Sequence, residues 1–275
     1  MPAQLEDDFC DIVRKASRGR GVDPPALAAR SGIAPTRLAE LIKGSTQPNE
    51  DEARDVARAL GLDPGKLADV ALRRWGPHPA QWDHVRHHPH DPHPSNGYLF
   101  FLQDNRTAAL IDPAGLPKTI LDAIAQGPYT LRYILVTHKH ADHCDATADI
   151  YAAFPDAQIV MHKADVAAIG SLAPRALQIN DNEEVPFGDG AGIRMLHTPG
   201  HTDGSVCYLF KSTLFSGDTL FAGSVGGAFG EKTGYSDILQ SIEHKLFKLD
   251  ETTVVMPGHG PPTTIAEERA HNPFF

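Results

Sequence analysis

The first 75 residues contain apolar positions at helical spacing. In "NEDEARDVARALG", Asn49 and Glu52 are typical of a helix start and Gly61 of a helix end. The apolar positions between them form one stripe: Ala53, Val56, Ala57 and Leu60. The segments "DPPALAAR" and "DPGKLADVAL" each begin with Asp-Pro, in which the aspartate caps the helix and the proline occupies its first turn. The pattern therefore predicts a small all-helical domain over residues 1–75.

From about residue 96 the pattern changes, because strand-like apolar runs alternate with helix-like ones. The strand-like runs include "GYLFFLQ", "TAALID", "LRYILVTH", "IRMLHT" and "TVVMPGHG". Helical spacing returns in "KTILDAIAQ" and in "YSDILQSIEHKLFKL". Residues 76–95, "GPHPAQWDHVRHHPHDPHPS", follow neither pattern, and we interpret them as a His- and Pro-rich linker. The prediction is a second domain over residues 96–275 that combines strands and helices.

Composition supports two soluble parts. The chain has 275 residues and 41% hydrophobic content, enough for one large and one small core. We find no run of eighteen apolar residues, so we expect no membrane partner. The start, "MPAQLEDDFC", is acidic and lacks the apolar stretch of a secretory signal. Three isolated cysteines give no disulfide framework, and we expect a cytoplasmic protein.

The net charge of −10 is unevenly distributed. Residues 1–75 contain twelve Lys and Arg and twelve Asp and Glu, and are therefore neutral overall. The other 200 residues contain thirteen Lys and Arg and 23 Asp and Glu, which accounts for the whole excess of negative charge. An acidic domain repels a polyanion, so nucleic acid is not an expected substrate of the larger part.

The stretch "THKHADHCD" concentrates side chains that bind metals. His138, His140, Asp142 and His143 lie within six residues, directly after the apolar run "LRYILV". Residues two apart in extended chain point the same way, so His138 and His140 can face one point. Imidazole nitrogen and carboxylate oxygen are the usual ligands of zinc and related divalent ions. A metal site is therefore predicted at the end of this strand.

Three more apolar runs end in a loop with a candidate ligand. "IRMLHTPGHTDGS" contains His201, "TLFSGDTLF" contains Asp218, and "TVVMPGHGP" contains His259. Glycine beside each ligand allows close backbone approach. Seven ligands exceed what one tetrahedral ion needs, and suit two ions with a shared carboxylate. Zinc is favoured, with iron and manganese as alternatives.

The motifs "THKHADH", "HTPGHTDGS", "FSGDTLF" and "MPGHG" together resemble the metallo-β-lactamase fold superfamily. The resemblance implies an α+β fold, an αββα sandwich with the site at one edge of its two sheets. It also implies that His138, His140 and His201 bind one metal, that Asp142, His143 and His259 bind the other, and that Asp218 bridges them. Within the superfamily, "LFSGDTLFAGSVG" and the C-terminal segment are similar to short glyoxalase II-like hydrolases that lack the C-terminal helical domain.

Those relatives imply a mechanism in which a metal-bridged hydroxide attacks a thioester or related acyl carbonyl, while Asp142 holds the nucleophile and relays a proton. The short relatives read G-R-T-D where this chain reads "GSVGGAFGEKTGY", so we expect different substrate contacts, with Lys232 and Tyr235 as candidates. Two alternatives are kept. One is a mononuclear iron persulfide dioxygenase that uses His138, His201 and Asp218. The other is a DNA-binding regulator whose hydrolase-like domain senses a metabolite.

The DNA alternative arises from "LAARSGIAPTRLAELIKG", which has the look of a helix-turn-helix. Residues of about 8–72 resemble Cro/C1-type repressor domains, and the resemblance implies a recognition helix over residues 35–43 and DNA contact through residues 23–45. Only Arg37 and Lys43 offer positive charge there, opposed by Glu40. The alternative roles are shielding of the active site and assembly of a homodimer.

Two further features each allow two interpretations. Cys144, next to His143, is a candidate redox-sensitive thiol or a small buried hydrophobic residue. The linker histidines are a candidate metal-loading tract or simply a polar linker that packs near the site. They are His78, His84, His87, His88, His90 and His93.

Overall fold

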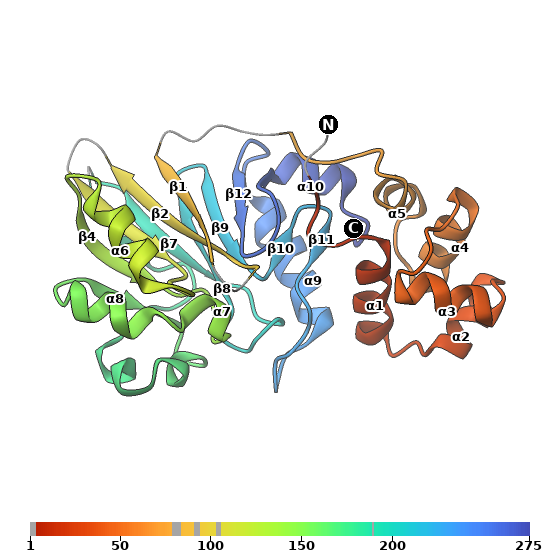
Figure 1. Cartoon of the computed structure of the whole chain (residues 1–275), viewed down its shortest axis with the longest axis horizontal. Helices are drawn as coiled ribbons and strands as arrows, with labels where there is room; N and C mark the ends of the chain where they lie inside the picture. Colours follow the sequence, from red (N-terminus) through yellow and green to blue (C-terminus); the bar gives the residue numbers. More distant parts are fainter. Residues whose placement is uncertain (1–3, 79–83, 91–93, 103–105, 189) are drawn as a thin grey trace.

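Five helices form the first part of the chain in this computed structural model, which describes residues 4–78, 84–90, 94–102, 106–188 and 190–275. They are α1 (Phe9–Arg20), α2 (Pro24–Ser31), α3 (Pro35–Lys43), α4 (Glu50–Leu60) and α5 (Pro64–Ala71), together named the helical region (Figure 1). The predicted caps are confirmed, because the side chains of Asp23, Asn49 and Asp63 each accept a hydrogen bond from a first-turn N–H. The predicted stripe of α4 is fully buried. Helix ends and core positions therefore follow the local sequence.

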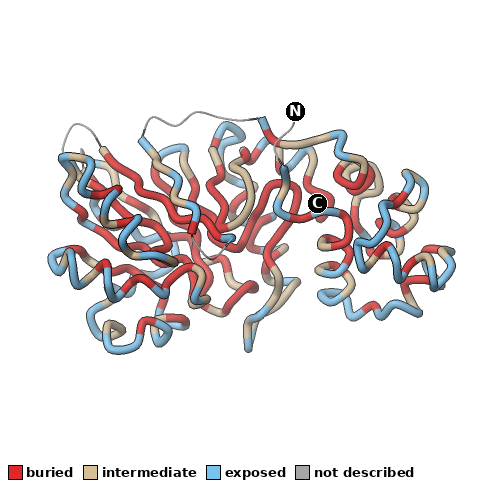
Figure 2. Tube along the Cα trace, in the orientation of Figure 1, coloured by how far each residue is buried: buried red, intermediate tan, exposed pale blue. Residues whose placement is uncertain are grey.

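Two sheets follow, and they lie face to face. The first has the strand order β1-β2-β3-β4-β5, with β2 and β3 antiparallel and β3, β4 and β5 parallel. Its strands are β1 (Val85–Pro89), β2 (Asn96–Leu102), β3 (Thr107–Ile111), β4 (Thr130–Leu135) and β5 (Gln158–Val160). Aromatic and aliphatic side chains of both sheets, such as Phe100, Phe187 and Phe215, pack between them. This shared layer is the centre of the fold (Figure 2).

The second sheet has the order β13-β12-β9-β8-β7-β6, in which only β9 and β12 run parallel. Its strands are β6 (Glu184–Pro186), β7 (Gly192–His197), β8 (Val206–Phe210), β9 (Thr213–Gly217), β12 (Val254–Pro257) and β13 (Thr263–Thr264). A short ribbon of β10 (Leu220–Phe221) and β11 (Ser224–Val225) projects from it.

Helices cover the outer face of each sheet. On the first sheet lie α6 (Pro117–Ala125), α8 (Thr147–Ala153) and the 3₁₀ segment η1 (Val166–Arg175), joined by a separate apolar cluster. On the second lie α9 (Tyr235–His244), the 3₁₀ turn η2 (Leu246–Lys248) and α10 (Ile265–His271). The predicted αββα sandwich is therefore confirmed, and the part from β1 to α10 is named the sandwich. None of the described helices is both long enough and apolar enough to cross a membrane.

Two local expectations are wrong. The predicted linker contains strand β1, which pairs with β2 from Val85 opposite Phe100 to Pro89 opposite Asn96. It is an edge strand without fully buried residues, which is where histidine and proline are tolerated. The predicted helix 235–249 ends at His244; Lys245 precedes a 3₁₀ turn, and its amine donates to the carbonyl of His197 at 2.6 Å.

The helical region packs directly on the sandwich. Side chains of all five helices share one apolar cluster with Ile238, Ile242 and Ile265 of the second layer. The N–H of Asp63 bonds the carbonyl of Pro273 at 2.8 Å, and the rings of Trp75 and His271 stack at 5.0 Å. Figure 1 shows α1 as the helix of this region that lies nearest the sandwich. The two parts therefore share a continuous core.

Candidate metal centre

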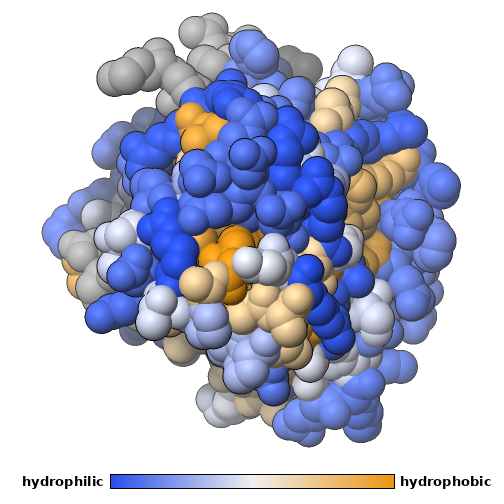
Figure 3. Space-filling model, turned by 90° about the vertical axis from the view of Figure 1, so that its right-hand side faces the viewer, coloured by the Kyte–Doolittle hydropathy of each residue, from blue (hydrophilic) through white to orange (hydrophobic). Residues whose placement is uncertain are grey.

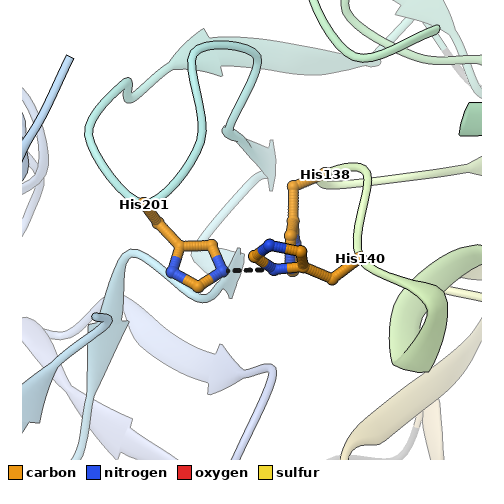
Figure 4. A group of neighbouring side chains, drawn as sticks. All are labelled: His138, His140 and His201. Carbon is orange, nitrogen blue, oxygen red and sulfur yellow. Dashed lines mark hydrogen bonds between the residues drawn. The ribbon is translucent and has the colours of Figure 1, made fainter. Parts of the chain in front are cut away.

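The first group of candidate ligands comes from two loops. His138 and His140 follow β4, and His201 lies between β7 and β8 (Figure 4). One ligand nitrogen from each ring lies within 4.8 Å of the others. The closest approach is 2.9 Å, between Nε2 of His201 and Nδ1 of His140. His138 is 1% and His201 3% exposed, and His140 is partly buried, so most of the group is shielded from bulk solvent.

The second group lies beside the first. Asp142 and His143 lie in the one-turn helix α7 (Ala141–Cys144), and His259 follows β12. A carboxylate oxygen of Asp142 lies 3.5 Å from Nε2 of His259 and 3.7 Å from Nε2 of His143. These three side chains also offer ligand atoms within 4.8 Å of one another. The structure therefore brings together the residues predicted for a second ion.

Asp218, after β9, lies between the two groups. Its Oδ2 is 3.4 Å from Nε2 of His201 and 4.0 Å from Nε2 of His138. Its Oδ1 is 3.4 Å from Nε2 of His143, and Oδ2 is 3.5 Å from Nε2 of His259. A side chain at Gly258 would place Cβ 2.3 Å from Asp218 Oδ1, so this close approach requires glycine. All seven predicted ligands thus converge, with Asp218 between the two groups.

Outer hydrogen bonds orient the histidines. His143 donates from Nδ1 to Asp112 at 3.0 Å, and His201 donates from Nδ1 to the carbonyl of Gly227 at 2.6 Å. His138 Nδ1 lies 3.0 Å from the hydroxyl of Thr137, which itself donates to Asp112 at 2.8 Å. A proton held at Nδ1 leaves the Nε2 lone pair for a metal, as in sites with ordered outer partners.

Burial and charge divide the two groups electrostatically. Burial lowers the pKa of His138 well below its usual value and that of His201 to about 4. Burial also opposes the charge on His259, but Asp142 and Asp218 outweigh it and raise the pKa to about 11. The hydrogen bond from His259 in turn lowers the pKa of Asp142 to about 2. Asp142 is therefore an anion at neutral pH, and the first group consists of neutral imidazoles, the form that binds metals. An ion in the second group would replace the proton that Asp142 and Asp218 hold on His259.

The donor set fits two divalent ions. Nε2 of His138 and Oδ1 of Asp218 are buried and have no hydrogen-bond partner among the described residues. Buried polar atoms are normally paired, so two unpaired atoms on residues whose ligand atoms lie within 4.8 Å of one another indicate a missing partner. Each group offers three ligand atoms, and the carboxylate of Asp218 can add a fourth to both. Such sets of imidazole nitrogen and carboxylate oxygen are suitable for zinc or a similar ion.

Sequence reasoning missed three residues that support the site. Asp112 follows the apolar run "TAALI", so the same strand-end signal that marked the ligands was present. Asp165 is buried and bonds the N–H of Lys139 at 3.1 Å and the hydroxyl of Thr202 at 2.5 Å, which joins the two ligand loops. Ser95 donates to the carbonyl of Asp142 at 2.6 Å. No local pattern marks Asp165 or Ser95.

The end of the predicted linker also packs behind the site. His90 is buried beside Ser95 and the carbonyl of Asp142, at 2.8 and 3.2 Å from its Nδ1. Burial lowers its pKa to about 4. His87 packs on the ring of Tyr98, whereas His93 lies outside the described residues. His90 therefore supports the loop of Asp142, and the prediction of a metal-loading tract stays untested.

A pocket of about 340 Å³ opens beside the site, and Asp218 and one ligand of each group line it. The sandwich lines it with His201, Asp218, Phe221 and His259, with residues 226–229 and with Tyr235. The opposite wall comes from residues 6 and 7 and from α1, through Asp11, Arg14, Lys15, Arg18 and Gly19. Of the two loop residues predicted to contact substrate, Tyr235 lines this pocket and Lys232 does not.

The other predicted residues lie apart from the pocket. Arg37 bonds both carboxylate oxygens of Glu52 at 2.8 Å and the hydroxyl of Thr46 at 2.7 Å, while Lys43 is exposed. Cys144 is buried, and burial raises the pKa of its thiol to about 12. A thiol with so high a pKa stays protonated at neutral pH, which favours its interpretation as a small buried residue.

Comparison with known proteins decides the family. A model described as the metallo-beta-lactamase superfamily matches residues 90–259. The chain belongs to the metallo-β-lactamase superfamily. A helix-turn-helix model matches residues 26–67, so the helical region is the predicted helix-turn-helix part. Hydroxyacylglutathione hydrolase GloC of Haemophilus influenzae is 30% identical over 188 residues, which cover 62% of this chain and 89% of that protein.

Two solved structures are similar to the sandwich of this metallo-β-lactamase superfamily member. The BLEG-1 B3 metallo-β-lactamase has a TM-score of 0.60 and 29% identity, and the match covers 69% of this chain and 98% of that one. TTHA1623 in a di-iron-bound form has a TM-score of 0.58 and 30% identity, over 69% and 100% of the two chains. The sandwich is therefore that of a metallo-hydrolase.

Proposed function

We propose that this protein is a binuclear metallo-hydrolase that cleaves a thioester or a related acyl compound. One observation carries the proposal: both three-residue groups are complete and share Asp218. The likeness to a hydroxyacylglutathione hydrolase supports a thioester as substrate. Zinc is the proposed metal, because the site offers nitrogen and carboxylate ligands.

The side chains of the site have different proposed roles. One ion would be held by His138, His140 and His201. The other ion would be held by Asp142, His143 and His259, and Asp218 would bind both. When bound, two such ions lower the pKa of water toward neutrality and polarise a carbonyl. The carboxylate of Asp142 is 31% exposed and faces the group from the solvent side, so it can orient the attacking water and accept its proton. A thiolate leaving group needs little acid assistance, since the pKa of a thiol is only about 8.5.

The test combines metal content with turnover. Protein purified without added metal is analysed for its elements and then assayed for thiol release from S-lactoylglutathione. We expect about two zinc or similar ions per chain, thiol release that a chelator abolishes, and recovery on adding zinc. Two metals without thiol release from any thioester would contradict the proposal.

The same experiment distinguishes a second candidate, a mononuclear iron persulfide dioxygenase. The two histidines His138 and His201 with the carboxylate of Asp218 form a set of the kind used by non-haem iron oxygenases. That chemistry does not require Asp142, His143 and His259, yet they are in place. About one iron per chain, no thiol release, and oxygen uptake with glutathione persulfide would favour the dioxygenase.

For the helical region, DNA binding through residues 23–45 is the further candidate that its helix-turn-helix match favours. The exposed face of α3 carries Glu40 and Lys43, whereas Arg37 is engaged with Glu52. The test is a titration of mixed-sequence duplex DNA at several salt concentrations. If α3 contacts phosphate, Lys43→Gln should reduce the salt slope by about 1. Absence of binding at low salt would reject the candidate.

A further inference from the structure

Helix α1 and the residues before it form a wall of the catalytic pocket, although they belong to the helical region. Lys15 reaches the sandwich, where its amine donates to the carbonyl of Val225 at 2.8 Å and lies 4.9 Å from the ring centre of Phe221. Gly19 lies against Tyr235, so closely that a Cβ would be 2.2 Å from the ring. The wall therefore contacts the sandwich at two positions of α1, Lys15 and Gly19.

The charged groups of this wall are mostly paired with one another. Asp7 pairs with Lys15, and Asp11 pairs with Arg14. Arg14 also donates to the carbonyl of Ile42 at 3.0 Å. Each of these cations is thus committed to a contact within the protein.

Arg18 differs from these neighbours. It lies one helical turn beyond Arg14, lines the same pocket and is exposed to solvent. Its guanidinium makes no hydrogen bond or ion pair with the residues that the structure describes. The remaining acid of the wall, Glu6, faces His259 at 3.7 Å. Arg18 is therefore the uncompensated charge on this side of the pocket.

The sandwich side of the pocket has a different character. Residues 226–229, which close it, are two glycines, Ala228 and Phe229, and none of them is charged. Phe229 is 53% exposed, and its ring centre lies 5.7 Å from that of His140 and 5.5 Å from that of His201. The pocket volume of about 340 Å³ is in the range of small-molecule sites. One pocket thus combines the metal ligands, an apolar lip and a free cation.

We propose that Arg18 is the anion-binding residue of the active site, and that the substrate is a thioester carrying a carboxylate or a phosphate at the end remote from the scissile bond. This inference rests on the proposed function and adds its substrate class. The whole net charge of −10 lies in residues 76–275, which form the sandwich side of the pocket, so an anionic substrate needs a local cation there. A guanidinium presents paired N–H donors that match either anion.

The test compares thioesters that differ in charge. Lactoyl thioesters of glutathione, of 4′-phosphopantetheine and of N-acetylcysteamine supply a carboxylate, a phosphate and a neutral group. They are assayed with the full-length wild type, Arg18→Gln, Arg18→Lys and, as a matched loss of one charge, Arg30→Gln. Arg30 is exposed on α2 and lies outside the pocket lining.

We expect Arg18→Gln to reduce the anionic-to-neutral ratio of kcat/KM about fivefold, as for one partly exposed ion pair. The loss should appear in KM, Arg18→Lys should restore part of it, and Arg30→Gln should leave the ratio unchanged. The ratio of kcat/KM is calculated separately for the glutathione and the phosphopantetheine thioester, each relative to the neutral one. The thioester whose ratio falls more in Arg18→Gln identifies the anion. An equal effect of Arg18→Gln on all three thioesters, or none, would overturn the inference while hydrolysis itself stands.

A direct binding measurement separates the two proposals. Titration calorimetry with S-methylglutathione and S-methyl-4′-phosphopantetheine measures affinity without turnover. If no thioester is hydrolysed but affinity for one of these anions falls about fivefold in Arg18→Gln, the anion site stands and the thioesterase proposal fails. If affinity is the same in wild type and Arg18→Gln, the anion site is rejected whatever the activity.

Discussion

The sandwich and the helical region meet at one pocket, but their polar side chains are organised in opposite ways. On the sandwich side, buried histidines and Asp218 direct their free atoms toward one another, and outer hydrogen bonds keep them there. On the helical side, acids and bases neutralise each other along α1, and Arg18 is left over. The difference indicates that the unpaired buried groups of the sandwich bind the metals, whereas the mostly paired charges of α1 form the wall through which a substrate reaches them.

A similar contrast exists within the helical region. Helix α3 has the motif position of a recognition helix, yet Arg37 is held by Glu52 and Thr46. Helix α1 has no recognisable motif, yet it lines the pocket and bonds the sandwich. The outer end of the molecule, formed by this region, is mainly hydrophilic (Figure 3). Contacts, and not motif position, therefore indicate which helix serves the hydrolase.

The largest effect on the sandwich side of the pocket is expected from Asp218→Ala. Loss of the shared carboxylate removes a ligand from both groups, so we expect kcat to fall by roughly a thousandfold or more and bound metal to decrease. Elemental analysis and turnover are measured on the same sample. Asp149→Ala, at an exposed position of α8, is the control. Full metal content and activity in Asp218→Ala would disprove the bridging position.

A smaller effect on the metal centre is expected from Asp112→Asn. Oδ2 of Asp112 accepts from His143 and from the hydroxyl of Thr137, and Oδ1 accepts from the N–H of Thr137. An amide replaces one of these oxygens with an NH₂ group, which cannot accept, so the imidazoles lose their fixed orientation. We expect metal affinity to decrease roughly 10- to 100-fold, measured by competition with a chromophoric chelator. Asp149→Asn serves as the matched control. Unchanged affinity would show that the outer hydrogen bonds do not orient the ligands.

The contact between the two regions is tested at Gly19. Alanine at a free helical position stabilises by about 1 kcal/mol relative to glycine, but here its Cβ would meet the ring of Tyr235. We expect Gly19→Ala to destabilise the protein by about 1–3 kcal/mol, measured from urea unfolding. In a Tyr235→Ala background the same substitution should be neutral or stabilising. Destabilisation in both backgrounds would place the cause outside this contact.

The smallest effect is expected from Lys43→Gln on α3. This lysine is exposed and does not line the pocket, so thioester turnover should stay within about twofold of the wild type, as for most surface substitutions. The measurement is kcat/KM with the glutathione thioester. A large loss would contradict the division of roles between α1 and α3.

The sequence by itself determined the seven candidate ligands and the helix ends of the helical region. Each of these signals is local: an apolar run that ends in a ligand and glycine, or a capping residue before an apolar stripe. His138 and His201 could be found without knowing what they contact, because their type and strand-end position were informative. The same signal would have identified Asp112 if it had been applied to every strand.

Tertiary structure alone decided which surfaces meet. Lys15 bonds Val225, a residue 210 positions away, and Gly19 fits the ring of Tyr235. Arg37 was a candidate DNA contact in the sequence and is bound to Glu52, whereas Arg18 had no distinguishing pattern and lines the pocket. Periodicity fixes which face of a helix is apolar, but the partner of a polar side chain depends on long-range packing. For that reason the metal centre was predictable and its helical wall was not.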